Sequence, residues 1–267
     1  MRIAAVTMVY NEPVWLPVWL RHHSRLVGLE NCLVLDHGSD DGSTAGLGVV
    51  VERVARTVLD EVERARVISD RVRDLLGSFD AVIHSDVDEL LVPRGRLPSS
   101  MGGVVTAVGL DLQHLPDEEP VFDPALPLGE QRRWVRFSAA ICKPVLVNEP
   151  VRWEAGFHGC NAASVFGDLY LVHLRYADLQ AGLRRLGRTR RLAFSGPEVN
   201  QHQRVPDHEF ETMMRAISGL PRLPGPLEPL VRPWMEAMVA GWARGDRQLS
   251  LYGDALWALP PNVLRQL

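Results

Sequence analysis

Two aspartates, Asp86 and Asp88, are the residues of this chain whose type and spacing best suit chemistry. They follow an apolar run at residues 79–83 that predicts a buried strand. If the strand continues, their side chains leave one face about 7 Å apart along it and repel each other. A divalent cation removes that cost, and such oxygen ligands suit Mg²⁺ or Mn²⁺, which keep positions open for substrate phosphates. The pattern therefore favours a metal site acting on a phosphorylated ligand; the alternative is a pair of turn-forming residues.

The first third of the chain alternates apolar runs with helical patterns. Strands are expected at residues 2–8, 31–35, 53–59 and 79–85, and helices at 16–27, after 43, and at 61–76. The strands are apolar without alternation, which is typical of a parallel sheet covered on both faces. Ligands of such sheets bind beyond the carboxyl ends of the strands. The polar loop at 36–43 and the acidic pair should therefore line one crevice.

The second half reads differently. Strands are expected at residues 104–113, 133–140, 144–147 and 168–174, followed by a basic helix at 178–192. From residue 206 onward, helices alternate with proline-rich turns. We therefore expect an α/β chain with a helical C-terminal extension over residues 201–267.

Bulk composition narrows the class of protein. The 267 residues carry a net charge of −4, which does not indicate a general nucleic-acid binder. Three cysteines lack any paired spacing, so neither a disulfide framework nor a zinc knuckle is expected. We see no signal-peptide pattern and no apolar run long enough to span a bilayer. The expectation is a cytoplasmic protein, with peripheral membrane association as a variant and the oligomeric state left open.

Four short motifs together resemble a known family. They are YNE at 10–12, WLRHH at 19–23, LDHGSDDGS at 35–43 and DVDE at 86–89. In this order and spacing the chain resembles GT-A fold glycosyltransferases, closest to the family 2-like group and the related family 92-type enzymes. The resemblance covers residues 1–93 and is weaker at 143–144, 156–159 and 171–175. It implies a GT-A-type, Rossmann-like and mostly parallel sheet flanked by helices.

The resemblance also implies a domain division. Residues 1–200 would form the glycosyltransferase domain, with the nucleotide sugar bound by 1–93 and the acceptor by 94–200. The helical extension at 201–267 would pack on the same domain.

The resemblance assigns donor-binding roles. Asp88 would bind Mn²⁺ or Mg²⁺ directly, and Asp86 would contact the donor ribose or reach the metal through water. The loop from Asp36 through Ser39 would cradle the nucleoside, and His37 stands where many members carry a second acidic residue. The turn that follows the first strand contains Asn11 and Glu12, and these two residues would contact the nucleotide. For Asn11 and Glu12 the alternative is a strand–helix turn with no ligand contact.

The remaining candidates lie in the second half. A third metal ligand is expected from His158 or His173, although a buried structural histidine is an alternative for the latter. Glu154 is the first choice of catalytic base if the reaction inverts the anomeric centre, ahead of Glu118 and Glu119. Arg188 would clamp the donor diphosphate or an anionic acceptor, with a solvated helix face as the alternative.

These observations predict a metal-dependent glycosyltransferase. It would move a hexosyl or related sugar from a UDP-, GDP- or TDP-sugar to a glycan, a lipid-linked acceptor or a small molecule. One alternative is a sugar-phosphate nucleotidyltransferase, although residues 8–12 lack the Gly-rich basic loop of that class. The other is an inactive domain that binds a glycan or a partner protein.

Overall fold

The computed structural model describes residues 1–56, 58–196, 201–244, 246 and 251–267. They divide into two units that interleave along the chain. Unit 1 comprises Met1–Ala107 and Lys143–Leu171, and unit 2 comprises Val108–Cys142 and Val172–Leu267. The chain therefore passes through each unit twice.

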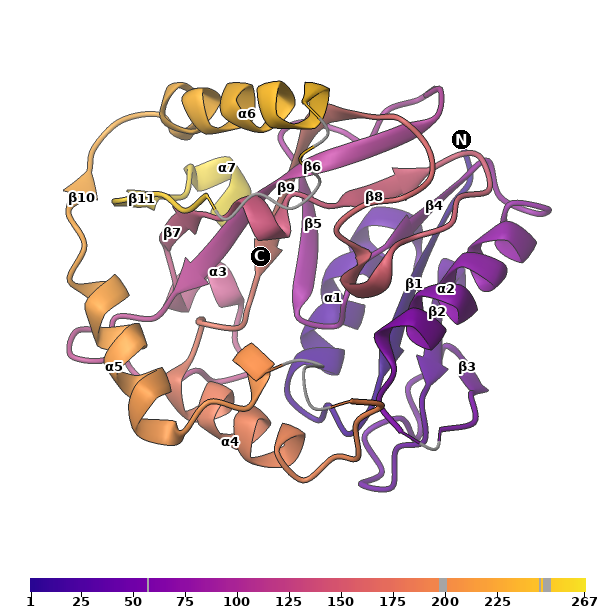
Figure 1. The fold of residues 1–267 in the computed structure, drawn as a ribbon, viewed down its shortest axis with the longest axis horizontal. Coiled ribbons are helices and arrows are strands. Elements are labelled where there is room, and N and C mark those ends of the chain that lie inside the picture. Colours follow the sequence, from indigo (N-terminus) through magenta and orange to yellow (C-terminus); the bar gives the residue numbers. More distant parts are fainter. Residues whose placement is uncertain (57, 197–200, 245, 247–250) are drawn as a thin grey trace. The chain divides into compact units, whose positions relative to one another are not determined.

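Unit 1 is built on four parallel strands in the order β4, β1, β2, β3 (Figure 1). They are β1 (Ile3–Val9), β2 (Cys32–Asp36), β3 (Val50–Arg53) and β4 (Ala81–His84). The first, second and fourth are buried along their whole length, as their unbroken apolar sequences require. The expected parallel sheet is thus confirmed.

Helices cover both faces of these strands. Helix α1 (Trp15–Val27) contacts β1 and β2, and a short η1 (Leu29–Asn31) follows it. Helix α2 (Glu61–Leu75) begins at Asp60, whose carboxylate accepts hydrogen bonds from the amides of Val62 and Glu63. The apolar face of α2 packs on β1 and β2 through Ala65, Ile68 and Val72.

Two local expectations for unit 1 are wrong. The third strand is β3 (Val50–Arg53) and not residues 53–59. Pairing decides this, because Leu33 to Asp36 of β2 align with Val50 to Arg53. No helix lies between residue 43 and β3; turns and bends lead from the loop into the strand.

The rest of unit 1 returns from later in the sequence. Strand β8 (Pro144–Val147) runs antiparallel to β4 and to the start of β6 (Val104–Gln113). Strand β5 (Glu89–Pro93), which the sequence did not predict, pairs with β9 (Ser164–His173). The single-turn η3 (Ala155–Phe157) packs against α2.

Unit 2 contains a mixed set of strands and most of the later helices. The end of β6 pairs antiparallel with β7 (Trp134–Phe137), which pairs with β11 (Leu256–Ala258), which pairs parallel with β10 (Arg222–Leu223). Its helices are α3 (Leu128–Gln131), η2 (Ala139–Ile141), α4 (Leu179–Thr189), η4 (Gln201–Gln203), α5 (Asp207–Ser218), α6 (Leu227–Ala243) and α7 (Pro261–Leu264). Helices α4 and α5 pack together through Leu179, Leu186, Phe210 and Met214.

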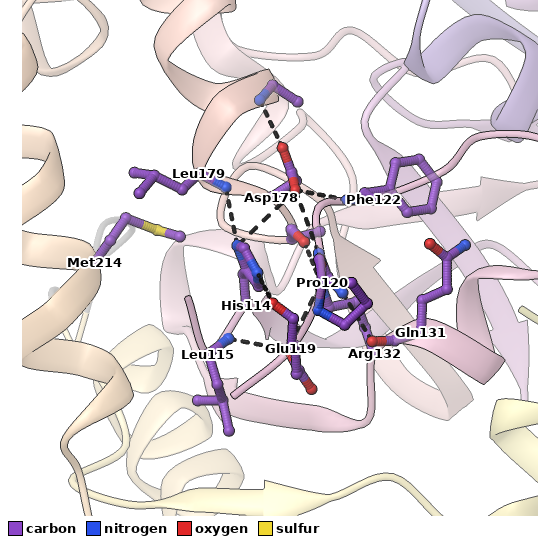
Figure 2. A network of polar contacts seen from close by, with 12 residues as sticks. His114, Leu115, Glu119, Pro120, Phe122, Gln131, Arg132, Asp178, Leu179 and Met214 are labelled. Atoms are coloured by element: carbon purple, nitrogen blue, oxygen red, sulfur yellow. Dashed lines mark hydrogen bonds and ion pairs between the residues drawn. The ribbon is translucent and has the colours of Figure 1, made fainter. Parts of the chain in front are cut away.

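A buried polar network holds the loop after β6 against the start of α4 (Figure 2). Arg132, 1% exposed, donates to the carbonyls of Ala177 and Pro120 and lies 3.3 Å from Oδ2 of Asp178. Nδ1 of His114 accepts from the amide of Leu179, so its Nε2 carries the proton donated to the Glu119 carbonyl. Burial, followed by the charge of Arg132, lowers the pKa of His114, which is therefore neutral near pH 7.

The α/β class with a largely parallel sheet flanked by helices is confirmed. None of the helices in the described part of the chain is long and apolar enough to cross a membrane. The domain boundary expected at residue 200 falls at residues 197–200, which are not among the described residues, and it stays a prediction.

Candidate functional site

The carboxyl ends of β1, β2 and β4 meet at one edge of unit 1. Val9 at the end of β1 pairs with Asp36 at the end of β2, and Val6 pairs with His84 at the end of β4. The segments that follow these three strands carry the motifs singled out from sequence. The edge of the parallel sheet therefore collects these segments, as expected for strands of one direction.

The turn after β1 and the loop after β2 are tied together by hydrogen bonds. The amide of Asn11 donates to Oγ of Ser39 at 3.0 Å, and its Nδ2 donates to Oδ1 of Asp40 at 2.7 Å. The amide of Asp40 returns a bond to Oδ1 of Asn11. Asn11 has a φ of 51°, a left-handed conformation that asparagine tolerates better than most residues. Asn11 and Ser39 thus fix this double loop, and Glu12 beside them is 5% exposed.

Asp36 organises the loop that it begins. Oδ1 accepts from the Ser39 amide at 2.7 Å, and Oδ2 accepts from Oγ1 of Thr44 and from Nη1 of Arg53. Burial by itself raises the pKa of Asp36, but these hydrogen bonds outweigh it and hold the pKa below its ordinary value. Asp36 is therefore a charged, buried anchor of the loop.

His37 lies among positive charges. Its side chain is buried, and its amide donates to the carbonyl of Val9. Burial and then the charges of Arg56 and Arg64 lower the pKa of His37 to about 4. Arg56 in turn stacks over the ring of Tyr10, 3.8 Å from its centroid. His37 is a neutral imidazole near pH 7.

The acidic motif does not continue the strand, and this part of the sequence prediction is wrong. Strand β4 ends at His84, and the Glu89 amide donates to the Asp86 carbonyl, which closes a turn over residues 86–89. The Glu89 carboxylate accepts from the Asp86 amide at 3.0 Å. Asp88, 4% exposed, lies inside this turn. The two aspartates are thus placed by a tight turn and not by strand alternation.

Asp86 is held between two cationic side chains. Nζ of Lys143 lies 2.9 Å from Oδ2 of Asp86 and 2.7 Å from Oε1 of Glu89. Nη2 of Arg64 lies 3.1 Å from Oδ1 of Asp86, and its guanidinium stands over the ring of Phe157. Burial by itself raises the pKa of Asp86, but Lys143 and Arg64 outweigh it and bring the pKa well below its ordinary value.

The same contacts act on Lys143. Burial alone lowers the pKa of Lys143, but the carboxylates of Asp86 and Glu89 outweigh it and hold the pKa above its ordinary value. Lys143 is therefore charged although only 5% of it is exposed. Asp86, Glu89, Arg64 and Lys143 form a compact charged group, which we call the charged turn; Arg64 also pairs with Glu61 at 2.7 Å.

The carboxylate oxygens of Asp86 and Asp88 are the type of ligand atom that a hard cation prefers. Mg²⁺ and Mn²⁺ prefer carboxylate oxygens and take their other ligands from phosphates and water. In the described part of the chain, no three His, Cys, Asp or Glu side chains are grouped as a metal-ligating set. A cation at Asp86 and Asp88 would share Asp86 with Lys143 and Arg64. The turn therefore suits a metal that arrives with a polyanionic ligand better than a permanently caged ion.

Glu154 and His158 flank η3. Glu154 is exposed, and its amide bonds to the carbonyl of Gly159. The ring of His158 lies so close to Gly156 that a Cβ there would come 3.0 Å from Nε2. The stacking of Arg64 over Phe157 connects η3 to the charged turn within unit 1. The roles of Glu154 and His158 stay predictions.

His173 and Arg188 belong to unit 2. Nδ1 of His173, at the end of β9, lies 2.7 Å from Oδ1 of Asp111 on β6. Arg188 is partly buried in the last turn of α4. Ligation by His173 and diphosphate binding by Arg188 also stay predictions.

Sequence reasoning missed several contributors. Arg64 looked like one of many charges on a surface helix, yet it is partly buried against Asp86. The carboxylate of Glu89, the last residue of the DVDE motif, binds both the Asp86 amide and Lys143. Asp111 lies in an apolar strand, where an isolated carboxylate was the available signal. The one sequence signal for Lys143 is that it is the only lysine in the sequence.

Comparison with known proteins adds little. No family model matches the sequence. No curated protein matches it either. Solved structures match parts of it, among them glucosyl-3-phosphoglycerate synthase from Mycobacterium tuberculosis in complex with phosphoglyceric acid. That match has 18% identity and a TM-score of 0.30, and it covers 40% of this chain and 43% of the other.

Two further solved structures match this chain to a similar extent. The same synthase in complex with Mg²⁺ and uridine diphosphate gives 19% identity and a TM-score of 0.28, with 40% and 43% of the chains covered. A cytidylyltransferase from Leptospira borgpetersenii serovar Hardjo-bovis gives 13% identity and a TM-score of 0.26, with 33% and 42% covered. The chain thus spans less than half the length of these proteins. Similarity of this extent carries no conclusion about function.

Proposed function

We propose that this chain is a metal-dependent glycosyltransferase that moves a sugar from a nucleotide-diphosphate sugar to an acceptor hydroxyl. The observation that carries the proposal is the charged turn at the carboxyl edge of the parallel strands of unit 1. Asp86, held by Lys143 and Arg64, stands there next to Asp88 and beside the two loops that follow β1 and β2.

The charges of this edge suit a diphosphate. Lys143 and Arg64 supply two fixed positive charges, and Asp86 and Asp88 would hold Mn²⁺ or Mg²⁺. Such a cation, when bound, neutralises the diphosphate and the charge that grows on it as the leaving group. Lys143 and Arg64 would stand beside a cation held by Asp86 and would add their positive charge near the phosphates of the donor.

The double loop is proposed to bind the nucleoside. Asn11, Glu12, Asp36, His37 and Ser39 lie at this edge, where donor nucleosides would be recognised by hydrogen bonds. His37 is uncharged near pH 7, so it can donate one hydrogen bond and accept another from a UDP, GDP or TDP base. Asp36 is engaged by Ser39, Thr44 and Arg53, and its first role is to hold the loop in shape.

The proposed roles of the residues on the acceptor side rest on fewer contacts than those on the donor side. Glu154 is exposed and would take the proton of the acceptor hydroxyl if the reaction inverts the anomeric centre. His158 or His173 would complete the metal shell; the bond from His173 to Asp111 is of the kind that orients metal-binding histidines. Arg188 would bind an anionic group of donor or acceptor. The acceptor itself is a glycan, a lipid-linked glycan or a small molecule.

Calorimetry with UDP, GDP and TDP and their sugars, with and without Mn²⁺, tests the proposal. We expect one diphosphate to bind in the presence of Mn²⁺ and to lose at least tenfold in affinity in Asp88→Asn. Asp254→Asn, at an exposed position of unit 2, serves as the matched control and should bind like the wild type.

Two outcomes would overturn the proposal. Turnover of a nucleoside triphosphate with a sugar phosphate would identify a nucleotidyltransferase. Failure of UDP, GDP, TDP and their sugars to bind, with the protein folded, would overturn the proposed activity and favour a non-catalytic binding domain.

A further inference from the structure

Unit 2 carries a second polar cluster on one face of its antiparallel strands. Asp111 of β6 stands directly opposite Arg136 of β7 in the register of the two strands. Their neighbours Leu110, Leu112, Val135 and Phe137 are fully buried on the other face. Alternation along both strands therefore brings one carboxylate and one guanidinium to the same surface.

The guanidinium of Arg136 is poorly satisfied. Its side chain is 15% exposed, and the nearest carboxylate oxygen, Oδ2 of Asp111, is 3.9 Å from Nη2. That distance is too long for a hydrogen bond. Nε of Arg136 is buried and has no hydrogen-bond partner among the described residues. A buried guanidinium with open donors is costly, since each unmet donor keeps its desolvation penalty.

Asp111 does not compensate this deficit, because it is used elsewhere. Its Oδ1 lies 2.7 Å from Nδ1 of His173, the shortest contact of the cluster. The carboxylate is thus shared between a close histidine and a more distant arginine. Arg136 therefore sits beside a carboxylate that is oriented towards His173.

Aromatic rings and a further arginine border the cluster. Arg136 stands over the ring of Tyr252, 4.9 Å from its centroid, and Tyr252 is 45% exposed. Arg175 stands 5.9 Å from the centroid of Tyr176. The charges of Asp111, Arg175 and Arg136 all reach the Tyr176 hydroxyl, which places them in one neighbourhood. The exposed ring of Tyr252 leaves this neighbourhood open to solvent.

We propose that this cluster is an oxyanion-binding site, with the fork of Arg136 as its anchor and the ring of Tyr252 as its wall. Its ligand is the carboxylate or phosphate group of a small molecule, which a planar guanidinium binds through two parallel hydrogen bonds. Binding would supply the acceptors that Arg136 lacks. That this small molecule is the acceptor of sugar transfer rests on the proposed function; the binding of the oxyanion does not.

The test is a titration of the intact protein with inorganic phosphate and, separately, with acetate. Nuclear magnetic resonance of the arginine Nε–H signals reports the site directly, with the Arg136 signal assigned by its loss in Arg136→Lys. We expect that signal to shift with saturation upon addition of phosphate, acetate or both, and the anion that acts identifies the ligand class. An Arg136 signal that neither anion moves would overturn the proposal.

A pair of variants tests the proposal by the affinity for the anion. Arg136→Gln should weaken the binding of the active anion at least tenfold, whereas Arg133→Gln, at the exposed position just before the same strand, should bind as the wild type does. Equal affinity of wild type and Arg136→Gln would contradict the proposal. If Arg136→Gln fails to fold, the titration of the wild-type Arg136 signal still decides. Absence of nucleotide binding would remove the proposed function and leave the oxyanion result standing.

Discussion

The ammonium group of Lys143 lies 2.9 Å from a carboxylate oxygen of Asp86, a residue 57 positions earlier in the chain. The same ammonium binds Glu89 at 2.7 Å, so one lysine holds both ends of the turn at residues 86–89. This contact joins the strand that enters the acidic motif to the return strand β8. It makes the motif a structural unit as well as a candidate binding site.

Replacing Lys143 should therefore destabilise the fold. Lys143→Met leaves Glu89, whose side chain is 2% exposed, without its cation, and breaking a buried pair costs about 3–5 kcal/mol. Urea unfolding at pH 7 measures the loss, and Lys143→Met combined with Glu89→Gln should recover part of it. The exposed pair Arg66–Glu63 offers a control, since Arg66→Gln should leave the unfolding free energy nearly unchanged. A Lys143→Met protein as stable as the wild type would show that the contact contributes nothing.

His84 should make stability dependent on pH. It packs against Trp153 and Phe157, and burial, with Lys143 and Arg64 opposed by Asp86, lowers its pKa to about 3. The unfolded chain binds a proton near pH 6.5 and the folded chain does not, so stability from this group is full above pH 6.5 and decreases towards pH 3. Between pH 7 and 5 we expect a loss of about 2 kcal/mol.

The variant His84→Phe isolates this effect, because a phenyl ring fits the aromatic surroundings and does not titrate. Urea unfolding at both pH values should show a smaller loss in the variant than in the wild type. His208→Gln, at an exposed position, is the control and should lose as much stability between the two pH values as the wild type. Identical pH dependence in wild type and His84→Phe would contradict the assignment.

Arg132 should stabilise the loop that joins β6 to β7. Its guanidinium donates to the carbonyls of Ala177, Gln131 and Pro120, so Arg132→Met takes this donor from the three carbonyls and removes the cation beside Asp178. We expect a loss of about 3–5 kcal/mol in the free energy of unfolding. Arg133→Met, at the exposed neighbouring position, is the matched control and should have little effect. Equal stability of the two variants would refute the importance of the network.

Gly109 should tolerate no side chain. A Cβ there would lie 2.5 Å from the carbonyl oxygen of Ser138 and 2.5 Å from the carbonyl carbon of Ile141. Gly109→Ala should therefore cost about 3 kcal/mol, since backbone must move to admit it. Gly102→Ala is the control, because no atom lies within 4 Å of its added Cβ. Thermal unfolding compares the two, and a wild-type midpoint for Gly109→Ala would contradict the expectation.

Metal removal should abolish transfer. If Asp86 and Asp88 hold the cation that neutralises a diphosphate, hydrolysis of the active nucleotide sugar should stop in EDTA and return on addition of Mn²⁺. Circular dichroism in EDTA should be unchanged, because the folded turn is already balanced by Lys143 and Arg64. Full hydrolysis in EDTA would exclude the metal role.

The sequence by itself determined strands β1, β2 and β4 and helices α1 and α2 in the first third, and the residues at the ends of these strands. Unbroken apolar runs specify β1, β2 and β4, because strands covered on both faces need no polar side. A parallel arrangement then requires that Asn11, Asp36 and Asp86 come to one edge. These inferences depend on local patterns and on the direction of strands, which are readable along the chain.

Only the tertiary structure decided which charges meet. Pairing with β2 placed the third strand at Val50–Arg53, against the local apolar signal further on. Asp86 and Lys143 are 57 residues apart, and Asp111 and His173 are 62 apart. Such contacts arise from the register of strands that are distant in sequence, so no local pattern encodes them. The charge pairs of the charged turn and of the cluster around Asp111 therefore follow only from the tertiary structure, whereas most strand positions follow from the sequence.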